Sequence, residues 1–242
     1  IGFAQITFKS LPNTIGGHSK KGEHGGIFSK GFKEIKAVFL DLMKRKTLRR
    51  FLGSYFFFNM GVQTVMVMAV LFARKEITWP DEKTKTNSLI ISILLIQFLA
   101  IGGSFLFSWS AKKIGNIKSL GCAIFLWIII CVATYALVRL PWHFYLIASA
   151  VGFTMGGIQA LSRSTYSKFL PETDDHASYF SFYDIMEKMG MIMGTITFGL
   201  ISQITGGMRN SVLALISFFV PDSGASLRRA EKREKPPVPE GI

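Results

Sequence analysis

Long apolar runs, separated by short clusters of basic residues, dominate the hydrophobic pattern of this chain. The runs cover residues 51–72, 88–110, 120–138, 142–161 and 180–204. Each has the length of roughly 20 residues that an α-helix needs to cross about 30 Å of hydrocarbon. The runs lack the alternation of apolar and polar positions that is typical of transmembrane barrel strands. The pattern therefore predicts an all-α polytopic membrane protein with helices over these ranges.

The residues before the first long run predict a linker that lies against the membrane. Residues 1–12 are apolar but too short to cross a membrane. Residues 13–50 begin as a mixture of Gly, Ser, Lys and His without periodicity, as in a solvated loop. From Phe32 to Arg50, apolar side chains recur on one helical face and lysines occupy other positions. This pattern predicts a basic amphipathic helix on the cytoplasmic surface of the membrane.

The end of the chain changes character at Pro221. The apolar run at 211–220 stops there after about half of the length that a span requires. Residues 221–242 are charged and rich in proline, which is typical of disordered segments. We therefore expect a truncated last helix that is followed by a disordered, charged, cytoplasmic tail.

Charged residues are kept apart from the apolar runs, although hydrophobic residues make up 49% of the sequence and the net charge is +13. Lys and Arg cluster just before residue 51 and in the loop 111–119, whereas the loop 74–87 contains both signs of charge. Because basic loops tend to remain in the cytoplasm, the first two segments are predicted inside and the third outside. Membrane topology thus accounts for the positive charge, and no nucleic-acid partner is expected.

The sequence contains no motif that indicates catalysis. It has no G-x-x-x-x-G-K-[ST] phosphate-binding loop, no H-E-x-x-H metal motif and no G-x-S-x-G nucleophile motif. His18 and His24 have no His or Cys partner at a spacing typical of metal ligands. We therefore expect neither an enzyme nor a metal or cofactor site.

Polar side chains inside the run 51–72 are candidates for contact with a solute. Asn59 and Gln63 follow Tyr55 at four-residue spacing, so all three share one face of the predicted helix. A buried amide requires a hydrogen-bonding partner or a watery cavity. These residues are interpreted either as the wall of a solute-binding cavity or as polar contacts between helices.

The run 142–161 combines small and polar residues. Gly152, Gly156 and Ala160 recur every four residues, a spacing that mainly favours close packing against another helix. Gln159 is a further candidate for solute contact. Arg163 follows near the inner end of the run, where it either takes part in a gate or extends to the membrane interface.

The run 180–204 carries ionisable residues where lipid would penalise them. Asp184 and Lys188 have the i, i+4 spacing of a helical ion pair, and Glu187 shares a stripe with Gly190. The charges are interpreted either as a functional network within the membrane or as an interfacial salt bridge that steadies the end of the helix.

Several of these residues belong to longer motifs. The motifs are Y-F-F-F-N-M-G-V-Q-T-V at 55–65, G-G-I-Q-A-L-S-R-S at 156–164 and F-S-F-Y-D-I-M-E-K at 180–188. With them, residues 32–219 resemble the C-terminal half of the vacuole-effluxer-like family of the major facilitator superfamily, which includes the fungal autophagy-related amino-acid effluxer. The resemblance implies the C-terminal six-helix bundle of a twelve-helix fold. Residues 1–12 would end the preceding helix, and the missing N-terminal half would be the first partner.

The resemblance also implies a secondary active transporter that moves a small solute, with amino acids suggested by the fungal relative, by alternating access. The solute contacts would be Asn59, Gln63 and Gln159. The charge network, which would break and re-form between inward and outward states, would consist of Arg163, Asp184, Glu187 and Lys188. Protons are the suggested coupling ion, and the bacterial inner (plasma) membrane is the expected location. The alternative is a membrane scaffold or receptor that transports nothing.

Overall fold

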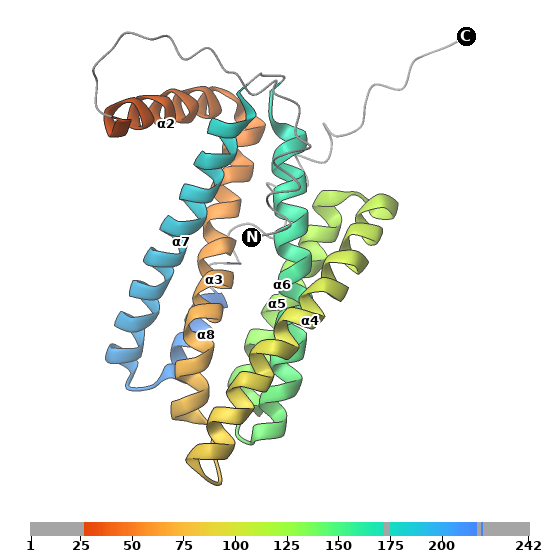
Figure 1. The fold of residues 1–242 in the computed structure, drawn as a ribbon, viewed down its shortest axis with the longest axis vertical. Coiled ribbons are helices and arrows are strands. Elements are labelled where there is room, and N and C mark those ends of the chain that lie inside the picture. Colours follow the sequence, from red (N-terminus) through yellow and green to blue (C-terminus); the bar gives the residue numbers. More distant parts are fainter. Residues whose placement is uncertain (1–26, 172–174, 217–218, 220–242) are drawn as a thin grey trace, which may run out of the picture.

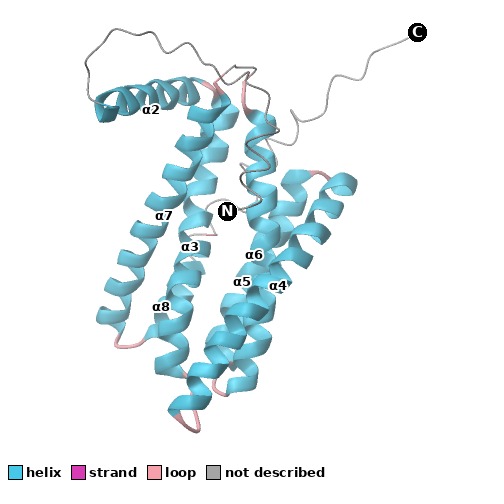
Figure 2. Cartoon of the chain, viewed as in Figure 1, coloured by secondary structure: helices cyan, strands magenta, loops and turns pink. Residues whose placement is uncertain are grey.

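A computed structural model describes residues 27–171, 175–216 and 219 of the chain. All regular secondary structure in these ranges is helical (Figure 2). The helices are α2 (Ile27–Lys44), α3 (Lys46–Glu76), α4 (Glu82–Ile114), α5 (Asn116–Leu137), α6 (Pro141–Phe169), α7 (His176–Thr205) and α8 (Met208–Ile216). The predicted all-α fold is confirmed for this part of the chain. The predicted end of a preceding helix at 1–12 and the predicted tail at 221–242 lie outside the described residues.

Four of the described helices are long and apolar enough to cross a membrane: α3, α4, α5 and α6. They confirm the predicted spans at 51–72, 88–110, 120–138 and 142–161. α7 has 30 residues but is not among them, because polar and ionisable residues interrupt its apolar sequence. The predicted helix at 180–204 is therefore confirmed as a helix, and its passage through the membrane stays a prediction.

The chain bends at Arg45, where the sequence predicts an uninterrupted helix from Phe32 to Arg50. Arg45 has an extended backbone (φ −90°, ψ 100°) between α2 and α3. The bend buries Leu42 on one side and Leu48 on the other, with 0% and 1% of their surfaces exposed. On a continuous helix these leucines would lie about 120° apart, and one core could not cover both. The predicted boundary is thus wrong, and α3 begins at Lys46.

Two further boundaries differ from the prediction and change where the charges lie. α6 continues to Phe169, so Arg163 is inside a helix rather than just beyond one. α7 begins at His176, where the Asp175 side chain accepts a hydrogen bond from the Ser178 backbone N–H at 3.2 Å. This N-cap starts the helix a full turn earlier than expected. The charges of α7 consequently lie about two to three turns inside its first residue.

The helices run up and down, and α2 lies across one end of the bundle (Figure 1). The turn from α4 to α5 lies toward the end that carries α2, whereas the connections α3–α4, α5–α6 and α7–α8 lie toward the other (Figure 1). The basic residues 44–50 and the basic loop 111–119 therefore fall on the same side, as the topology prediction requires. We call this end of the bundle the α2 end.

Close contact between α4 and α6 depends on glycine. Gly152 and Gly156 of α6 face the backbone of Ile96 and Ala100 in α4, and a Cβ at either glycine would overlap these backbone atoms. This contact bears out the packing interpretation of the small residues in the run 142–161. It fixes the rotation of α6, which carries Gln159 and Arg163.

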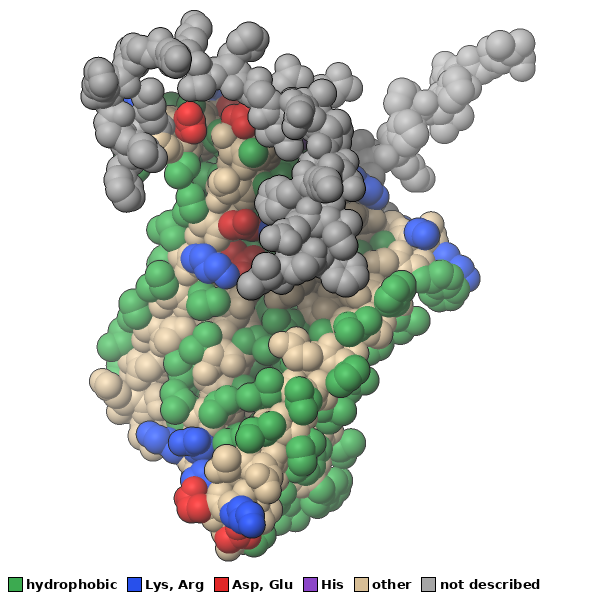
Figure 3. Space-filling model, in the orientation of Figure 1, with side chains coloured by type: hydrophobic (Ala, Val, Ile, Leu, Met, Phe, Trp, Pro, Cys, Tyr) green, Lys and Arg blue, Asp and Glu red, His purple; other side chains and the backbone are tan. Residues whose placement is uncertain are grey.

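The outer surface of the bundle is apolar over much of its height (Figure 3). On α4, the side chains of Phe98 and Phe105 are 73% and 75% exposed, and Ile101 between them is 58% exposed. A soluble monomer rarely exposes so continuous an apolar surface. Lipid is a suitable environment for it, and with the four membrane-length helices it identifies an integral membrane protein.

Candidate functional site

A polar cavity of about 870 Å³ lies between α3, α6 and α7, in the part of the bundle nearer the α2 end. Its wall includes every residue that the sequence nominates as a site residue. These are Asn59 and Gln63 from α3, Gln159 and Arg163 from α6, and Asp184, Glu187 and Lys188 from α7. Residues that are up to 129 positions apart in sequence therefore share one cavity.

The two amides of α3 connect it to α7 through Glu187. Asn59 and Gln63 are 5% and 6% exposed. Asn59 donates from Nδ2 to the Glu187 backbone carbonyl at 3.2 Å, and Gln63 donates from Nε2 to Glu187 Oε1 at 3.2 Å. Each amide is thus both part of the cavity wall and a contact between helices. The two interpretations offered by the sequence are compatible.

The charged side chains pair differently from the sequence prediction. Asp184 accepts a hydrogen bond from the guanidinium of Arg163 across the cavity, and Lys188 pairs with Glu187 Oε1 at 3.2 Å. The predicted i, i+4 ion pair between Asp184 and Lys188 is wrong. The physical reason is that α6 brings a guanidinium to Asp184, which leaves the Lys188 ammonium beside Glu187.

Aromatic rings complete the wall next to the charges. Tyr55 of α3 stacks on Tyr183 of α7 with ring centroids 4.3 Å apart, and Tyr183 also contacts Tyr166 at 4.9 Å. The Arg163 guanidinium lies 5.7 Å from the Tyr183 ring and 5.9 Å from the Phe180 ring, within cation–π range.

The sequence placed Tyr55 on the candidate face with Asn59 and Gln63, but it did not nominate Tyr183, Tyr166 or Phe180. One signal was available for Tyr183, which directly precedes Asp184. Tyr55 and Tyr183 line the cavity together with Phe180. An aromatic residue next to a charged residue, or four positions from a buried amide, therefore indicates a side chain in the cavity wall.

Glycines of α7 place Glu187 against α3. A Cβ at Gly190 would lie 3.0 Å from Asn59 Nδ2, and one at Gly194 would overlap Thr64 Oγ1. The small residues let the two helices approach so closely that the Gln63 amide reaches the Glu187 carboxylate. The helical face that Glu187 shares with Gly190, as the sequence predicts, therefore faces α3.

The cavity offers chemistry suited to binding. Two cationic and two anionic side chains face it, and its amides supply donors and acceptors without a net charge. Within the part of the chain that the structure describes, no group of three His, Cys, Asp or Glu residues is placed to hold a metal ion. The arrangement can recognise a small polar solute through several directed hydrogen bonds.

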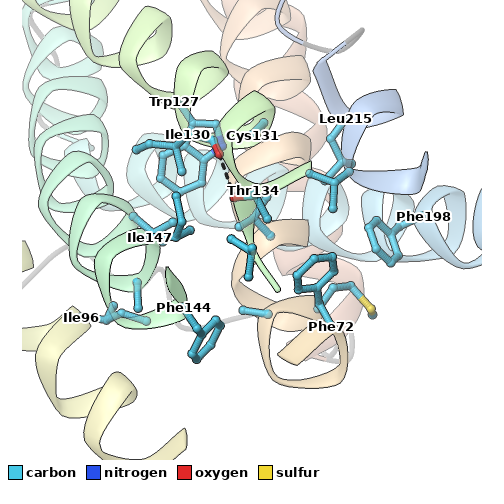
Figure 4. Close-up of a pocket in the computed structure, with 17 residues that line it drawn as sticks. Phe72, Ile96, Trp127, Ile130, Cys131, Thr134, Phe144, Ile147, Phe198 and Leu215 are labelled. Carbon is cyan, nitrogen blue, oxygen red and sulfur yellow. Dashed lines mark hydrogen bonds between the residues drawn. The ribbon is translucent and has the colours of Figure 1, made fainter. Parts of the chain in front are cut away.

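A second cavity, of about 60 Å³, has the opposite character (Figure 4). Helices α3 to α8 all contribute to its wall, which is almost entirely apolar and includes Trp127, Phe144 and Phe198. Its hydroxyl, at Thr134, donates to the Ile130 carbonyl at 2.7 Å (Figure 4). A polar solute would find almost no partner here, so the cavity between α3, α6 and α7 is the candidate site.

Membrane-length helices around a polar, solute-sized cavity are the architecture of helical membrane transport proteins. The chain belongs to the family described as Vacuole effluxer Atg22 like, whose sequence profile matches residues 1–234. This finding confirms the resemblance to the vacuole-effluxer-like family. The family is one of transporters rather than enzymes.

Two relatives illustrate the range of the family. The chain is similar to a protein of Bacillus subtilis (strain 168) named "Uncharacterized MFS-type transporter YxiO", with 31% identity over 202 residues that cover 83% of the chain and 45% of the relative. It is also similar to Autophagy-related protein 22 of Yarrowia lipolytica, with 25% identity over 207 residues, covering 81% and 34%. The chain thus spans less than half the length of these relatives.

Proposed function

We propose that this chain forms the C-terminal six-helix half of a secondary active transporter that moves a small solute by alternating access. The observation that carries the proposal is the convergence of amides and charged side chains from three helices on one cavity. In transporters of this type, the solute site lies between two bundles that rock against each other. The missing N-terminal half, as partner, would supply the opposite wall.

The proposed solute is a small zwitterion such as an amino acid. Arg163 and Lys188 offer positive partners for a carboxylate, and Asp184 and Glu187 offer negative partners for an ammonium group. Gln159 is exposed in the same wall and supplies a further donor and acceptor. The fungal effluxer resemblance points to the same class of solute.

Glu187 is the residue that we propose both binds the coupling proton and takes part in the gate. Its Oε1 atom accepts from Gln63 Nε2 and pairs with Lys188 Nζ, each at 3.2 Å. Protonation of this carboxylate would remove the charge that holds Lys188. The contacts between α3 and α7 would then weaken, and the network of Arg163, Asp184, Glu187 and Lys188 would re-form in the other state.

The proposed location is a bacterial inner (plasma) membrane, with the α2 end and the C-terminal tail in the cytoplasm. The supporting observation is that the basic residues 44–50 and 111–119 lie at the same end of the bundle (Figure 1). By the positive-inside tendency, this arrangement supports a cytoplasmic position for that end. The positive charge then requires no nucleic-acid partner.

Thermal stabilisation of the purified protein by a panel of amino acids, sugars, nucleosides and organic ions tests solute binding. A ligand that binds only the folded state raises the melting temperature, by an amount that grows with its concentration over Kd. We expect a selective shift that Gln63→Ala abolishes. Gln203→Ala is the matched control, because Gln203 is exposed on α7 and does not line the cavity.

Flux in proteoliposomes tests transport itself. We expect Glu187→Gln to reduce flux by roughly tenfold or more, since a hydrogen bond to a charged group contributes ~1.5–3 kcal/mol. Glu82→Gln at the opposite end is the control, because the Glu82 side chain is 85% exposed. Unchanged flux in Glu187→Gln would count against the proposed gate.

The second candidate is a membrane scaffold or receptor. The observation in its favour is that Asn59 and Gln63 are both used in contacts between helices. Saturable flux of a solute by the protein would exclude it. Absence of both flux and any thermal shift would favour it over the transporter.

A further inference from the structure

α2 is held in a fixed orientation across the α2 end of the bundle (Figure 1). Val38 and Leu42 are buried, with 6% and 0% of their surfaces exposed. Asp41 Oδ2 accepts a hydrogen bond from the Tyr179 hydroxyl of α7 at 2.8 Å. The ring of Phe39 packs 5.9 Å from that of Phe182. One face of α2 therefore packs against α7. This contact fixes the rotation of α2, and with it the direction in which its other side chains point.

A neighbouring face of α2 is apolar and uncovered in the described structure. Phe32 is 72% exposed, Leu40 is 51% exposed and Phe39 is 42% exposed even though it touches Phe182. At about 100° per residue, Phe32, Phe39 and Leu40 fall within one arc of roughly 100°. Such an arc on a helix that lies across a bundle end is typical of interfacial helices.

Lysines lie within and along one border of this arc. Lys36 falls between Phe32 and Leu40 on the helical wheel, and Lys33 lies just beyond Leu40. The acidic residues of α2, Glu34 and Asp41, occupy the far side of the helix. Lys33 and Lys36 are both exposed. Long basic side chains beside apolar ones can extend to headgroups while their stems cover hydrocarbon.

The positive charge continues from α2 into the first turns of α3. Residues 32–50 hold seven basic and two acidic residues, a net charge of +5. They are Lys33, Lys36, Lys44, Arg45, Lys46, Arg49 and Arg50 against Glu34 and Asp41. A neutral surface gives such a cluster no partner, whereas anionic lipid headgroups attract it.

The apolar arc lies next to an exposed apolar surface of α7. α2 projects past α7 at one side of the bundle, and exposed hydrophobic side chains run along α7 below it (Figures 1 and 3). Among them, Ile192, Ile196 and Leu200 are 59%, 57% and 55% exposed. Hydrocarbon that covers α7 would end at the level of α2.

We infer that the exposed face of α2 is a docking surface for an anionic phospholipid leaflet. Phe32, Phe39 and Leu40 enter the boundary between headgroups and acyl chains. Lys33 and Lys36 contact the phosphates, and the contact with Tyr179 transmits the position of the leaflet to the inner end of α7. The inference goes beyond transport, since lipid binding at α2 is measurable whether or not a solute moves.

Fluorescence of a labelled cysteine tests where the face lies. Phe32→Cys in a variant with Cys122→Ala and Cys131→Ala is labelled with an environment-sensitive dye, and the protein is reconstituted in nanodiscs. We expect a blue-shifted emission that lipids with a quencher in the acyl chain reduce severalfold. Glu34→Cys is the matched control, because Glu34 lies on the opposite side of the same helix and should respond only to an aqueous quencher.

A titration with short-chain phosphatidylglycerol tests the charge requirement. Each lysine near an anionic surface accounts for about a fivefold change in affinity. The double variant Lys33→Gln and Lys36→Gln should therefore weaken binding roughly 25-fold at low salt, whereas short-chain phosphatidylcholine should bind weakly to both proteins. Lys75→Gln with Lys83→Gln, at the other end of the bundle, is the matched control and should have little effect.

Three outcomes would overturn the inference. The first is a dye at position 32 that is quenched from water as readily as at position 34, because the face would then be solvated. The second is a blue-shifted dye that no lipid-borne quencher reaches, because protein would then cover the face, from a second copy or another segment. Equal affinity for the two lipids would likewise exclude an anionic requirement.

Discussion

The pairs α4–α6 and α3–α7 both depend on glycine, but different atoms surround the two contacts. In α4–α6, Gly103 faces the Phe153 carbonyl and Gly156 faces the Ala100 carbonyl, so backbone packs directly on backbone. In α3–α7, Gly190 faces the amide of Asn59, and Gly194 faces the hydroxyl of Thr64 as well as the Met60 carbonyl. The first contact is apolar and closed, and the second borders the polar cavity.

The difference shows that four-residue glycine spacing predicts which helices pack closely. It does not predict whether their contact borders a functional site. Four-residue spacing occurs in both pairs, because any close approach requires small residues. What distinguishes α3–α7 is the presence of buried amides opposite an ionisable residue. Glu187 remains partly accessible, with 24% of its side chain exposed, while its carboxylate accepts the hydrogen bond from Gln63.

The largest expected effect comes from breaking the contact between α4 and α6. In Gly103→Ala the added Cβ would overlap the Phe153 backbone, and backbone cannot rotate away as a side chain can. We expect a loss of about 3 kcal/mol or more in the free energy of unfolding. Gly102→Ala is the control, because a Cβ there meets nothing within 4 Å. Thermal unfolding in detergent measures both variants, and equal melting temperatures would contradict the close approach.

A smaller loss is expected from the polar contact between α3 and α7. Gln63→Leu keeps the approximate side-chain volume but removes the donor to Glu187 Oε1. Interhelical hydrogen bonds in membranes contribute ~0.6–2 kcal/mol, so we expect destabilisation in that range. Gln203→Leu, at an exposed position of α7, should change stability by less than about 0.5 kcal/mol. A reversed order would show that the amide is dispensable for packing.

The ion pair between α6 and α7 should matter more for transport than for stability. The side chains of Arg163 and Asp184 are 56% and 52% exposed, so solvent screens their attraction. We expect Arg163→Gln to change the free energy of unfolding by less than about 1 kcal/mol. In the proposed gate, the same variant lowers solute flux in proteoliposomes by roughly tenfold.

An exchange of the two charges sharpens this test. Arg163→Asp combined with Asp184→Arg keeps one positive and one negative side chain in the same part of the cavity. Recovery of flux relative to Arg163→Asp alone would identify the pair as the functional unit. If the double variant is no better than the single one, the contribution of Arg163 lies in its contacts with the rings of Phe180 and Tyr183 instead.

The smallest effect is expected at the contact between α2 and α7. The hydrogen bond from Tyr179, with help from Arg45, lowers the pKa of Asp41 below its ordinary value of 3.8. The ionised form therefore stabilises the folded protein above about pH 3.8, and this contribution is lost as the pH falls through the lower folded pKa. Because the Asp41 side chain is 36% exposed, it amounts to less than about 1 kcal/mol.

Melting curves of the protein and of Asp41→Asn at several pH values measure this contribution. At neutral pH the unsubstituted protein should melt at a slightly higher temperature, and the difference should shrink below pH 3.8 and disappear as the pH falls through the lower folded pKa. Tyr179→Phe removes the main cause of the shift and should behave like Asp41→Asn at neutral pH. A difference that persists at low pH would show that Asp41 acts through something other than its charge.

Much of this protein follows from the order of residues along the chain. The length of an apolar run and the position of basic loops are one-dimensional properties, so the spans over α3 to α6 and their alternating direction were predictable. The candidate residues were predictable for a similar reason. An amide such as Asn59 or a charge such as Glu187 stands out within an apolar run, because hydrocarbon offers it no partner.

Other features depend on how the helices rotate and cross, which no single segment specifies. Asp184 and Lys188 have suitable spacing for an ion pair, yet Asp184 pairs with Arg163 because α6 lies alongside α7. Tyr55 stacks on Tyr183 because glycines let α3 and α7 approach. The bend at Arg45 likewise depends on the core, because it allows Leu42 and Leu48 to be buried at the same time. Side-chain partners of this kind arise from packing between distant segments, where burial and geometry outweigh local spacing.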